Sequence, residues 1–380
     1  MRGSKLLYIY PQHHTVSFTL IARKHIEWIR KLGLAEVQEL DELTLPSYIP
    51  HLKYVAVLQP YIFIYHRLIR SKYDMLSPNI RGRFQEYLSW WRSNYGGFVG
   101  IDVCDSDRLS DYAVTMLNNA DRVVVPSNFC VDVYRSSGVV RPIHRLPHGV
   151  DPEWYYLPNQ WDVTPVKAIN PSILELYLYK VRRGRKVLLY YLWHSSWRKG
   201  WREVRELYSR LVRERRDVVL VLKTLAPNSP EFQEVMDLGA IQVYGWLSEY
   251  DKLLLYDLAD ITLNFSYGGG FELNCLESLA RGVPCVASDW GSWTDYVPSY
   301  LRVRVGEKVQ PLPNNVIHVG YGYRVDVESA LDKVNDVLDK YEDYRARTEG
   351  WRAEVLSSVY RWDVIARELV GIIDSGRGKQ

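Results

Sequence analysis

Cysteine is scarce in this sequence of 380 residues. Its four cysteines, Cys104, Cys130, Cys275 and Cys285, contain no Cys-x-x-Cys pair. Zinc sites and disulfide frameworks usually show closely spaced or regularly repeated cysteines, so both are disfavoured here. We therefore expect four free thiols in a reducing compartment.

Long apolar runs and an excess of one charge are also missing. No run approaches the roughly 20 residues of a membrane-spanning helix, and the apolar run in "MRGSKLLYIYPQHH" is too short for a signal peptide. The 48 basic and 45 acidic side chains give a formal net charge of +3, which carries no nucleic-acid signal. We expect a cytoplasmic protein that binds no nucleic acid but has room for a local basic site. Peripheral contact with a membrane remains an alternative.

Two common nucleotide-binding fingerprints are absent. No strand-like segment runs into Gly-x-Gly-x-x-Gly, and no Gly-Lys-Ser/Thr sequence of a P-loop occurs. Their absence argues against a nicotinamide-dependent dehydrogenase, although the chain has the alternation of strands and helices that such enzymes share.

That alternation is the main organising pattern. Short apolar runs such as "KLLYIY" and "DRVVVPS" alternate with helical patterns such as "SFTLIARKHIEWIRKLG", which predicts parallel sheets with helices on both faces. Prolines at positions 152, 158, 165 and 171 interrupt the pattern and suggest an interdomain connection. We predict an α/β protein with two Rossmann-like, doubly wound domains facing a cleft: residues 1–165, residues 166–355, and a final helical segment, 356–380, packing back on the first domain.

The stretch "SYGGGFELNCLESLARGVPCVASDWGS" combines glycines, a helix start and two carboxylates. Gly268 to Gly270 permit close approach of a ligand to the backbone, and a helix starting near Asn274 would favour a phosphate. Glu277 lies one turn into this helix. Its position also fits a capping box with Asn274, and Glu272 could serve only the helix dipole. Local pattern alone leaves these alternatives open.

Several motifs resemble a known family. "GGGFELNCLESLARGVPCVASDWGSWTDYV" is similar to the carboxyl-terminal signature of retaining glycosyltransferases of the GT-B fold, specifically the sucrose-synthase and mannosyltransferase-like family four. The segments "FVGIDVCDSDRLSDY", "DRVVVPSNFCVDVYRSSGV" with "LPHGVDPEWY", "WHSSWRKGWRE" and "YRWDVIARELVGII" also resemble this family, in the order expected from about residue 98 to residue 373. Residues 1–97 share only the rhythm of strands and helices.

The resemblance implies roles for individual donor-site residues. Glu277 matches the second glutamate of a Glu-x7-Glu pattern, which is expected to bind the nucleotide ribose. Lys199 matches a lysine that contacts the donor diphosphate, with Arg198 beside it. Lys223 ends an apolar strand and either serves the diphosphate as well or snorkels to solvent.

Further donor contacts are expected around the glycine-rich loop. The resemblance implies that backbone N–H groups there face the distal phosphate or the sugar, and that a second segment lies near the nucleobase. The residues concerned are Gly269, Gly270, Phe271, Leu273 and Asn274 in the loop, and Trp246 and Leu247 near the base. Trp246 as a core residue is the alternative.

Two departures from the family concern the donor sugar. The first glutamate of the Glu-x7-Glu pattern is replaced by Gly269, and an arginine usual before Lys199 is absent, with Trp193 and His194 in that region. Glu272, three residues beyond Gly269, could bend back and replace the missing carboxylate.

The amino-terminal half contributes an acidic cluster, "DVCDSD". Asp102 stands where the family often has histidine, and Asp105 stands where a subgroup has glutamate. Either carboxylate could orient the acceptor hydroxyl or the donor sugar, and a turn-stabilising role is the alternative. No second acidic cluster accompanies them, so we expect no metal.

The resemblance implies transfer of a sugar from a nucleotide-diphosphate sugar, such as a UDP- or GDP-sugar, to an acceptor hydroxyl with retention of configuration. It implies no cofactor besides this co-substrate. The acceptor, whether glycan, lipid, protein or small molecule, is not defined by the sequence. A nucleotide-sugar-binding protein without transferase activity is the main alternative, and an epimerase or phosphorylase of the same fold is another.

Overall fold

The chain divides into two compact units. The computed structural model describes residues 4–14, 16–75, 86, 89, 92–163, 168–192, 195–225, 227 and 229–375. Unit 1 comprises Met1–Gly149, Asn314–Val319 and Tyr360–Gln380, and unit 2 comprises Val150–Pro313 and Gly320–Val359.

Unit 1 contains a six-stranded parallel sheet in the order β2-β1-β3-β4-β5-β6. Its central strands are buried on both faces, because helices cover both sides, and this explains their continuous apolar sequences. The strands are β1 (Ser4–Tyr10), β2 (Ala35–Asp41), β3 (Val55–Leu58), β4 (Phe98–Ile101), β5 (Arg122–Val125) and β6 (Ile143–Arg145).

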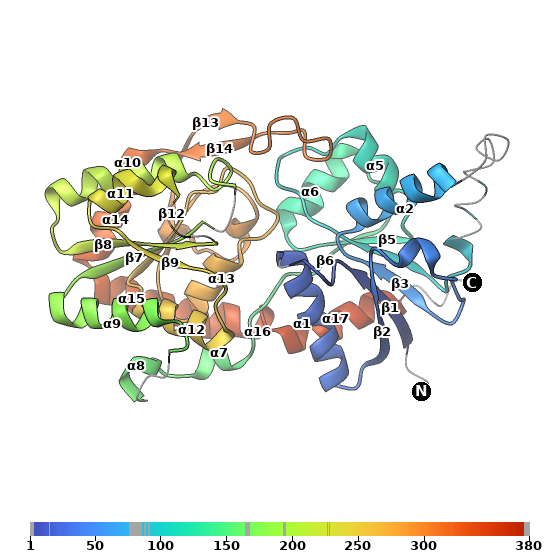
Figure 1. The fold of residues 1–380 in the computed structure, drawn as a ribbon, viewed down its shortest axis with the longest axis horizontal. Coiled ribbons are helices and arrows are strands. Elements are labelled where there is room, and N and C mark those ends of the chain that lie inside the picture. The colour runs from blue at the N-terminus through green and yellow to red at the C-terminus, as the bar shows by residue number, and fades with distance from the viewer. Residues whose placement is uncertain are drawn as a thin grey trace. The chain divides into compact units, whose positions relative to one another are not determined.

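In unit 1, α1 and α17 lie on one face of the sheet and α2, α5 and α6 on the other (Figure 1). These helices are α1 (Ser17–Lys31), α2 (Tyr61–Met75), α5 (Asp111–Leu117), α6 (Asn128–Ser137) and α17 (Trp362–Asp374), and a 3₁₀ turn covers Leu45–Ser47. Local signals define the ends of α6: the Ser127 side chain accepts a hydrogen bond from the Cys130 N–H, and Gly138 ends the helix at φ 105°.

Unit 2 contains a second six-stranded parallel sheet, in the order β12-β11-β10-β7-β8-β9. Successive strands are added on one side of β7 up to β9 and on its other side from β10 onwards. In open α/β sheets, ligands bind beyond the carboxyl ends of the strands at such a switch point. The strands are β7 (Lys186–Leu192), β8 (Val218–Thr224), β9 (Ile241–Tyr244), β10 (Ile261–Asn264), β11 (Cys285–Ser288) and β12 (Arg302–Val303).

Helices also lie on both faces of the second sheet, with α10 and α11 on one side and α9 and α12 on the other (Figure 1). The helices of unit 2 are α7 (Glu153–Tyr156), α8 (Gln160–Val163), α9 (Pro171–Arg183), α10 (Trp201–Glu214), α11 (Gln233–Asp237), α12 (Glu249–Leu258), α13 (Leu273–Ala280), α14 (Val327–Asp339), α15 (Tyr341–Trp351) and α16 (Ser357–Val359). Short 3₁₀ turns cover Pro230–Phe232, Ser292–Asp295 and Ser299–Leu301, and a π-helical turn covers Arg352–Leu356.

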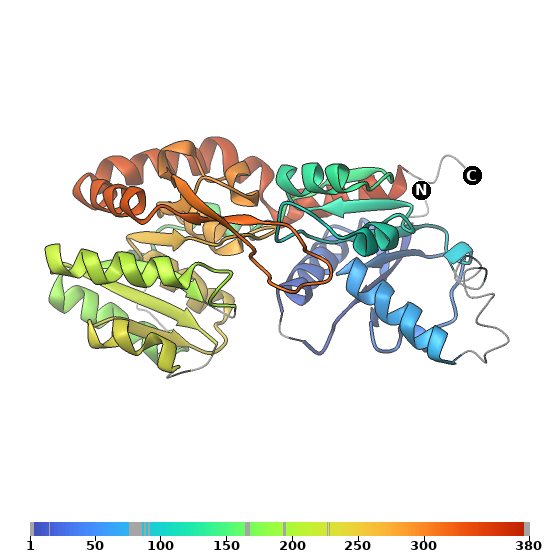
Figure 2. The same ribbon diagram turned by 90° about the horizontal axis from the view of Figure 1, so that it is seen from above.

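The strands β13 (Val305–Val309) and β14 (Gly322–Val325) form a two-stranded antiparallel sheet of their own, drawn in orange in Figure 2. The chain between its strands includes Asn314–Val319, which belongs to unit 1. There the Ser110 N–H donates to the Ile317 carbonyl at 2.9 Å, and Leu109 forms an isolated bridge with His318. This short segment therefore packs on the loop that follows β4.

Two parallel α/β units of Rossmann type confirm the predicted fold class. The observed division of the chain differs from the expected boundary after residue 165, because the structure places residues 150–163 in unit 2. Arg281 explains this difference: its guanidinium donates to the carbonyls of Trp154, Leu157 and Pro158 at 2.7–2.9 Å. The proline-rich segment is thus anchored to unit 2, while α17 packs against α1 in unit 1.

Candidate active site

The loop between β10 and α13 carries four of the predicted residues, Gly269, Gly270, Phe271 and Glu272. It runs from Phe265 to Glu272, and α13 begins at Leu273. The first N–H groups of a helix have no intrahelical partner, so Leu273 and Asn274 present them at the helix start. The predicted backbone donors are therefore located at the amino terminus of a helix, as a phosphate would require.

Arg198 and Lys199 come close to this loop because of Gly200. This glycine has φ 75°, and a Cβ atom there would lie 2.1 Å from the Phe265 carbonyl oxygen. Only glycine permits such close approach of two backbones. The contact continues at the next residues, where the Tyr267 N–H donates to the Arg198 carbonyl at 2.7 Å. The "RKG" sequence thereby places two cations against the glycine-rich loop.

Both cations face the same carboxylate. Lys199 Nζ donates to Glu272 Oε2, and Arg198 Nη1 lies 3.7 Å from Glu272 Oε1. Arg198 also donates to the Gly268 carbonyl at 2.8 Å. Glu272 is only 3% exposed, so the two positive charges compensate a buried negative charge. We call Arg198, Lys199 and Glu272 the donor-loop cluster.

The Glu272 carboxylate occupies the space beside Gly269. A Cβ atom built at Gly269 would lie 2.5 Å from Glu272 Oε1 and 3.5 Å from Arg198 Nη1. A side chain at position 269 would therefore point into the volume that Glu272 now fills. The side chain of Glu272 bends back towards Gly269, as the hypothesis of a compensating carboxylate requires.

Two further side chains hold the loop in place. Ser292 Oγ donates to the Gly269 carbonyl at 2.7 Å. The Tyr296 hydroxyl accepts from the Glu272 N–H at 3.1 Å and donates to the Glu272 carbonyl at 2.8 Å, while its ring stacks on Phe271 at 4.7 Å. Sequence reasoning missed both residues. The Gly-Ser-Trp turn after β11 was the available signal, because it follows the strand next to β10.

Glu277 does not form the capping box considered from the sequence. The amino-terminal cap of α13 is Glu272, with no side-chain cap bond. Instead, Glu277 Oε1 accepts from Lys252 Nζ at 2.7 Å and Oε2 accepts from the Tyr256 hydroxyl at 2.8 Å. Both partners lie on α12, four residues apart and therefore on one face. The sequence signal for them was a cation and a tyrosine flanking the apolar run "LLL".

The remaining predicted residues of unit 2 lie in two settings. Lys223 is buried at the end of β8 and donates to the carbonyls of Thr224 and Gly245 at 3.0 and 2.5 Å. Burial lowers the pKa of Lys223 to about 8. Leu247 is buried, whereas Trp246 is 60% exposed, so Trp246 is no core residue. Trp193 and His194 lie outside the described residues.

In unit 1, Asp102 is directed towards the start of α2. Its Oδ2 accepts from the Ile62 N–H at 2.7 Å and its Oδ1 from the Val103 N–H at 2.8 Å. Burial, with a smaller contribution from the charge of Asp105, raises the pKa of Asp102 to about 7, against the lowering effect of these N–H donors. The Asp105 N–H donates to His318 Nδ1 at 3.3 Å. These contacts give Asp102 a local structural role in addition to its predicted one.

The structure thus brings Arg198, Lys199, Glu272 and Gly269 together and places Glu277 in α13, the helix that Glu272 precedes. In the other unit, Asp102 lies near Asp105. Among the described residues, no three His, Cys, Asp or Glu side chains are arranged to share a metal ion. Within the same part of the chain, no helix has the length and apolar character needed to span a bilayer.

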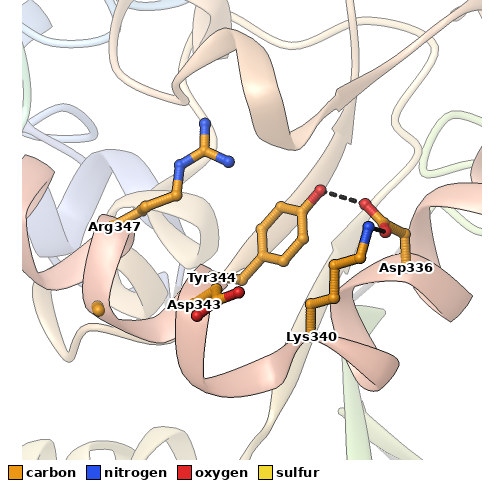
Figure 3. Close-up of a pocket in the computed structure, with 6 residues that line it drawn as sticks. Asp336, Lys340, Asp343, Tyr344 and Arg347 are labelled. Carbon is orange, nitrogen blue, oxygen red and sulfur yellow. Dashed lines mark hydrogen bonds and ion pairs between the residues drawn. The ribbon is translucent and has the colours of Figure 1, made fainter.

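A pocket elsewhere in unit 2 contains none of the predicted residues. It has a volume of about 490 Å³ and is lined by Asp336, Lys340, Asp343, Tyr344, Ala346 and Arg347 (Figure 3). Asp336 accepts from the Tyr344 hydroxyl and pairs with Lys340 at 2.7 Å. Asp336 is therefore occupied by Tyr344 and Lys340, and the donor-loop cluster remains the better candidate site.

Comparisons with known proteins show what the chain is similar to. The family model of glycosyl transferases group 1 matches residues 185–307, which contain the donor-loop cluster and Glu277. An uncharacterized protein of Sulfolobus islandicus rod-shaped virus 1 is 27% identical over 348 residues, covering 90% of this chain and 91% of the relative. A putative glycosyltransferase of Sulfolobus islandicus filamentous virus is 24% identical over 257 residues, covering 64% and 65% of the two chains.

Solved structures show the same fold. A glycosyltransferase from Rickettsia africae has a TM-score of 0.64 at 14% identity, and each chain is covered completely. WaaG, a glycosyltransferase involved in lipopolysaccharide biosynthesis, has a TM-score of 0.58 at 14% identity, with 98% of this chain and 100% of WaaG covered. The two Rossmann-like units therefore have the GT-B fold. Within this fold, residues 185–307 are similar to the glycosyl transferases group 1 family.

Proposed function

We propose that this protein is a retaining glycosyltransferase that uses a nucleotide-diphosphate sugar. The observation that carries the proposal is the donor-loop cluster, in which two cations and a buried carboxylate meet at the start of a helix. A glycosyl donor of this kind leaves as a diphosphate. Cations and helix N–H groups placed there stabilise the growing negative charge in the transition state more than in the ground state.

Different residues of unit 2 bind different parts of the donor. Lys199 and Arg198 bind the diphosphate, with the N–H groups of Leu273 and Asn274 at the helix start. Glu277 accepts hydrogen bonds from the ribose, and Lys252 and Tyr256 orient its carboxylate. The exposed ring of Trp246 lies near the base, and Lys223 supplies a further positive charge. Unit 2 is then the nucleotide-sugar unit and unit 1 the acceptor unit.

Glu272 contacts the donor sugar in place of the carboxylate missing at Gly269. Diphosphate binding draws Lys199 away from Glu272 and leaves a carboxylate able to accept hydrogen bonds from sugar hydroxyls. The sugar is then transferred to an acceptor hydroxyl on the same face, and the leaving phosphate accepts the proton. This route requires neither a metal ion nor a nucleophile from the protein. Asp102 or Asp105 orients the acceptor.

A nucleotide-sugar-binding protein without transferase activity is the second candidate, because Gly269 removes a polar contact to the sugar. The position of the Glu272 carboxylate beside Gly269 favours the transferase. We infer a cytoplasmic enzyme that binds no nucleic acid. The hydroxyl of a glycan, lipid, protein or small molecule is the acceptor, and a lipid acceptor would bring the enzyme to a membrane surface.

A thermal-shift screen with UDP, GDP, ADP and their sugars tests donor binding without knowledge of the acceptor. A donor at 100 times its Kd should stabilise unit 2 by about 2.7 kcal/mol. Any donor found is then incubated with candidate acceptors, and the anomeric configuration of the product is read by NMR, with and without a chelator. No shift with any nucleotide would reject the proposal. Donor binding without transfer or donor hydrolysis would favour the binding protein.

A further inference from the structure

All four cysteines of the chain lie in two buried pairs, one pair in each unit. In unit 1, Cys104 Sγ lies 3.2 Å from Cys130 Sγ, and both residues are completely buried. Cys104 belongs to the loop after β4, and Cys130 lies in the first turn of α6. The two sulfurs of a disulfide are about 2.0 Å apart, so the gap would have to close by only about 1.2 Å.

The second pair joins α13 to the neighbouring strand. Cys275 lies in α13 and Cys285 is the first residue of β11, which packs against that helix. Both are completely buried. Burial, and after it the neighbouring Cys285 thiol, raise the pKa of Cys275 well above its usual value. The two cysteines are ten residues apart in sequence but belong to different elements. A bond between them would therefore fix the position of α13 on the sheet.

A buried cysteine often serves only as a small apolar residue. That role explains why each of these residues is buried, but it does not require one cysteine to contact another. Here each of the four has a cysteine as a neighbour, and the two contacts lie in separate cores. The pairing, rather than the burial, needs an explanation.

We infer that the two pairs are sites of covalent cross-linking, Cys104 with Cys130 and Cys275 with Cys285. A small disulfide such as oxidised glutathione serves as oxidant. One protein thiolate attacks it and releases one reduced thiol, and the partner thiolate then attacks the mixed disulfide and releases the second. Each protein disulfide thus forms as two protons and two electrons pass to the reagent. All four thiols are free in this structure, as the sequence predicts for a reducing compartment, and the links form only where such an oxidant is present. The inference does not depend on transferase activity.

The location of the pairs gives the cross-links a structural consequence. Cys104 lies between Asp102 and Asp105 in sequence, and Cys275 lies between Glu272 and Glu277. Each disulfide would tether the segment that carries the candidate residues of its unit. Burial raises the pKa of Cys104 and Cys275 well above the usual value, so the thiolates form readily only while the chain is folding or locally open.

Refolding of the full chain tests the inference. Denatured protein is refolded either with a mixture of oxidised and reduced glutathione or with excess reducing agent, and free thiols are then alkylated in denaturant. Refolding with glutathione should leave no alkylated cysteine and lower the mass by about 2 Da for each link. Trypsin cuts after Arg108, Arg122 and Arg281, so the two cysteines of each pair lie on different peptides and each cross-link is identified directly.

Two matched variants serve as controls. Cys130→Ser should lose only the first link and Cys285→Ser only the second, whereas the oxidised parent should melt about 6–10 °C above its reduced form. Links between Cys104 or Cys130 and Cys275 or Cys285, four alkylated cysteines after oxidative refolding, or equal melting temperatures would overturn the inference. One link with the other two thiols free would overturn the assignment of the unlinked pair. The alkylation count on the parent stands even where a variant fails to fold.

Discussion

The two units each contain a buried carboxylate after a parallel strand, but the partners of these carboxylates differ. Glu272 in unit 2 is held by the side chains of Lys199 and Arg198, whereas Asp102 in unit 1 accepts hydrogen bonds from the backbone of Ile62 and Val103. Backbone N–H groups that bind a carboxylate hold the local chain in place, and they cannot move away to bind a ligand. Side-chain cations can exchange a protein carboxylate for a ligand phosphate.

This difference indicates which of the two carboxylate sites is better suited to bind an anionic ligand. The donor-loop cluster holds positive charge that Glu272 neutralises, and this is the charge that we propose for diphosphate binding. The surroundings of Asp102 offer no such exchange, and burial keeps its carboxyl protonated over part of the ordinary pH range. Four predictions test the contrast, from the largest expected effect to the smallest.

Replacement of Lys199 should have the largest effect. Lys199→Ala removes a preorganised positive charge at the leaving group, so donor binding or turnover should fall by about 10²–10³-fold. Calorimetry with a nucleoside diphosphate and turnover of its sugar measure the loss. Lys340→Ala is the matched control, since Lys340 pairs with Asp336 outside the cluster. Equal affinity and equal turnover in parent and Lys199→Ala would show that Lys199 does not bind the donor.

An exchange of residues 269 and 272 should have the next largest effect. Glu272→Gly should weaken binding of the intact nucleotide sugar by about 10- to 100-fold, the range for a lost hydrogen bond to a charged group. Binding of the bare nucleoside diphosphate should change much less. In the double variant Gly269→Glu/Glu272→Gly, the new side chain enters the volume vacated by Glu272, and most of the lost affinity should return.

The single variant Gly269→Glu is the control for this exchange. It places a second carboxylate where the Cβ atom already meets Glu272 Oε1 at 2.5 Å, so it should bind the sugar poorly and unfold more easily. Equal affinity of parent and Glu272→Gly for intact donor would mean that Glu272 does not contact the sugar. A protein that binds no nucleotide at all would instead contradict the proposed function.

The pH dependence of stability should reveal the cost of burying Asp102. Its pKa is about 7 in the folded protein and near 4 in the unfolded chain, so the folded state binds more protons between these values. The stabilisation from the protonated form is complete below pH 4 and is lost as the pH rises through 7. Relative to Asp102→Asn, the parent should lose roughly 2 kcal/mol of unfolding free energy between pH 5 and 7.

Urea unfolding at several pH values measures this difference between parent and Asp102→Asn. Asp121→Asn is a suitable control, because Asp121 also accepts a backbone N–H, from Phe98 at 2.8 Å, but lies nearer the surface. A difference that stays constant from pH 5 to 7 would show that Asp102 titrates normally and is exposed to solvent in the native ensemble.

The contrast between Glu272 and Asp102 also marks the limits of sequence reasoning. Alternating apolar runs predicted both sheets, because strand and helix periodicities depend on neighbouring residues. The "RKG" sequence predicted positive charge at the loop, and the structure adds the reason: Gly200 permits contact with Phe265. In contrast, no local pattern links Asp102 to Ile62, forty residues earlier, or Lys252 to Glu277 on another helix.

The domain boundary shows the same limit. Prolines indicated a connection between residues 152 and 171, where the alternation of strands and helices is interrupted. Which side the segment joins depends on Arg281, more than one hundred residues later, whose five donors are shared between Asp257 and three carbonyls. Tertiary hydrogen bonds of this kind have no signature in the segment they anchor.

The smallest predicted effect concerns Asp105, whose charge acts on Asp102. Asp105 raises the pKa of Asp102 less than burial does, so Asp105→Asn should lower the midpoint of the stability change by only a fraction of a pH unit. The same urea series, with Asp107→Asn as the matched neighbour, measures this shift. A midpoint that falls to the usual range of an aspartate would show that repulsion between the two carboxylates, not burial, governs Asp102. The acidic loop of unit 1 would then resemble the donor-loop cluster, as a site organised by side-chain charges that a ligand or substrate could redistribute.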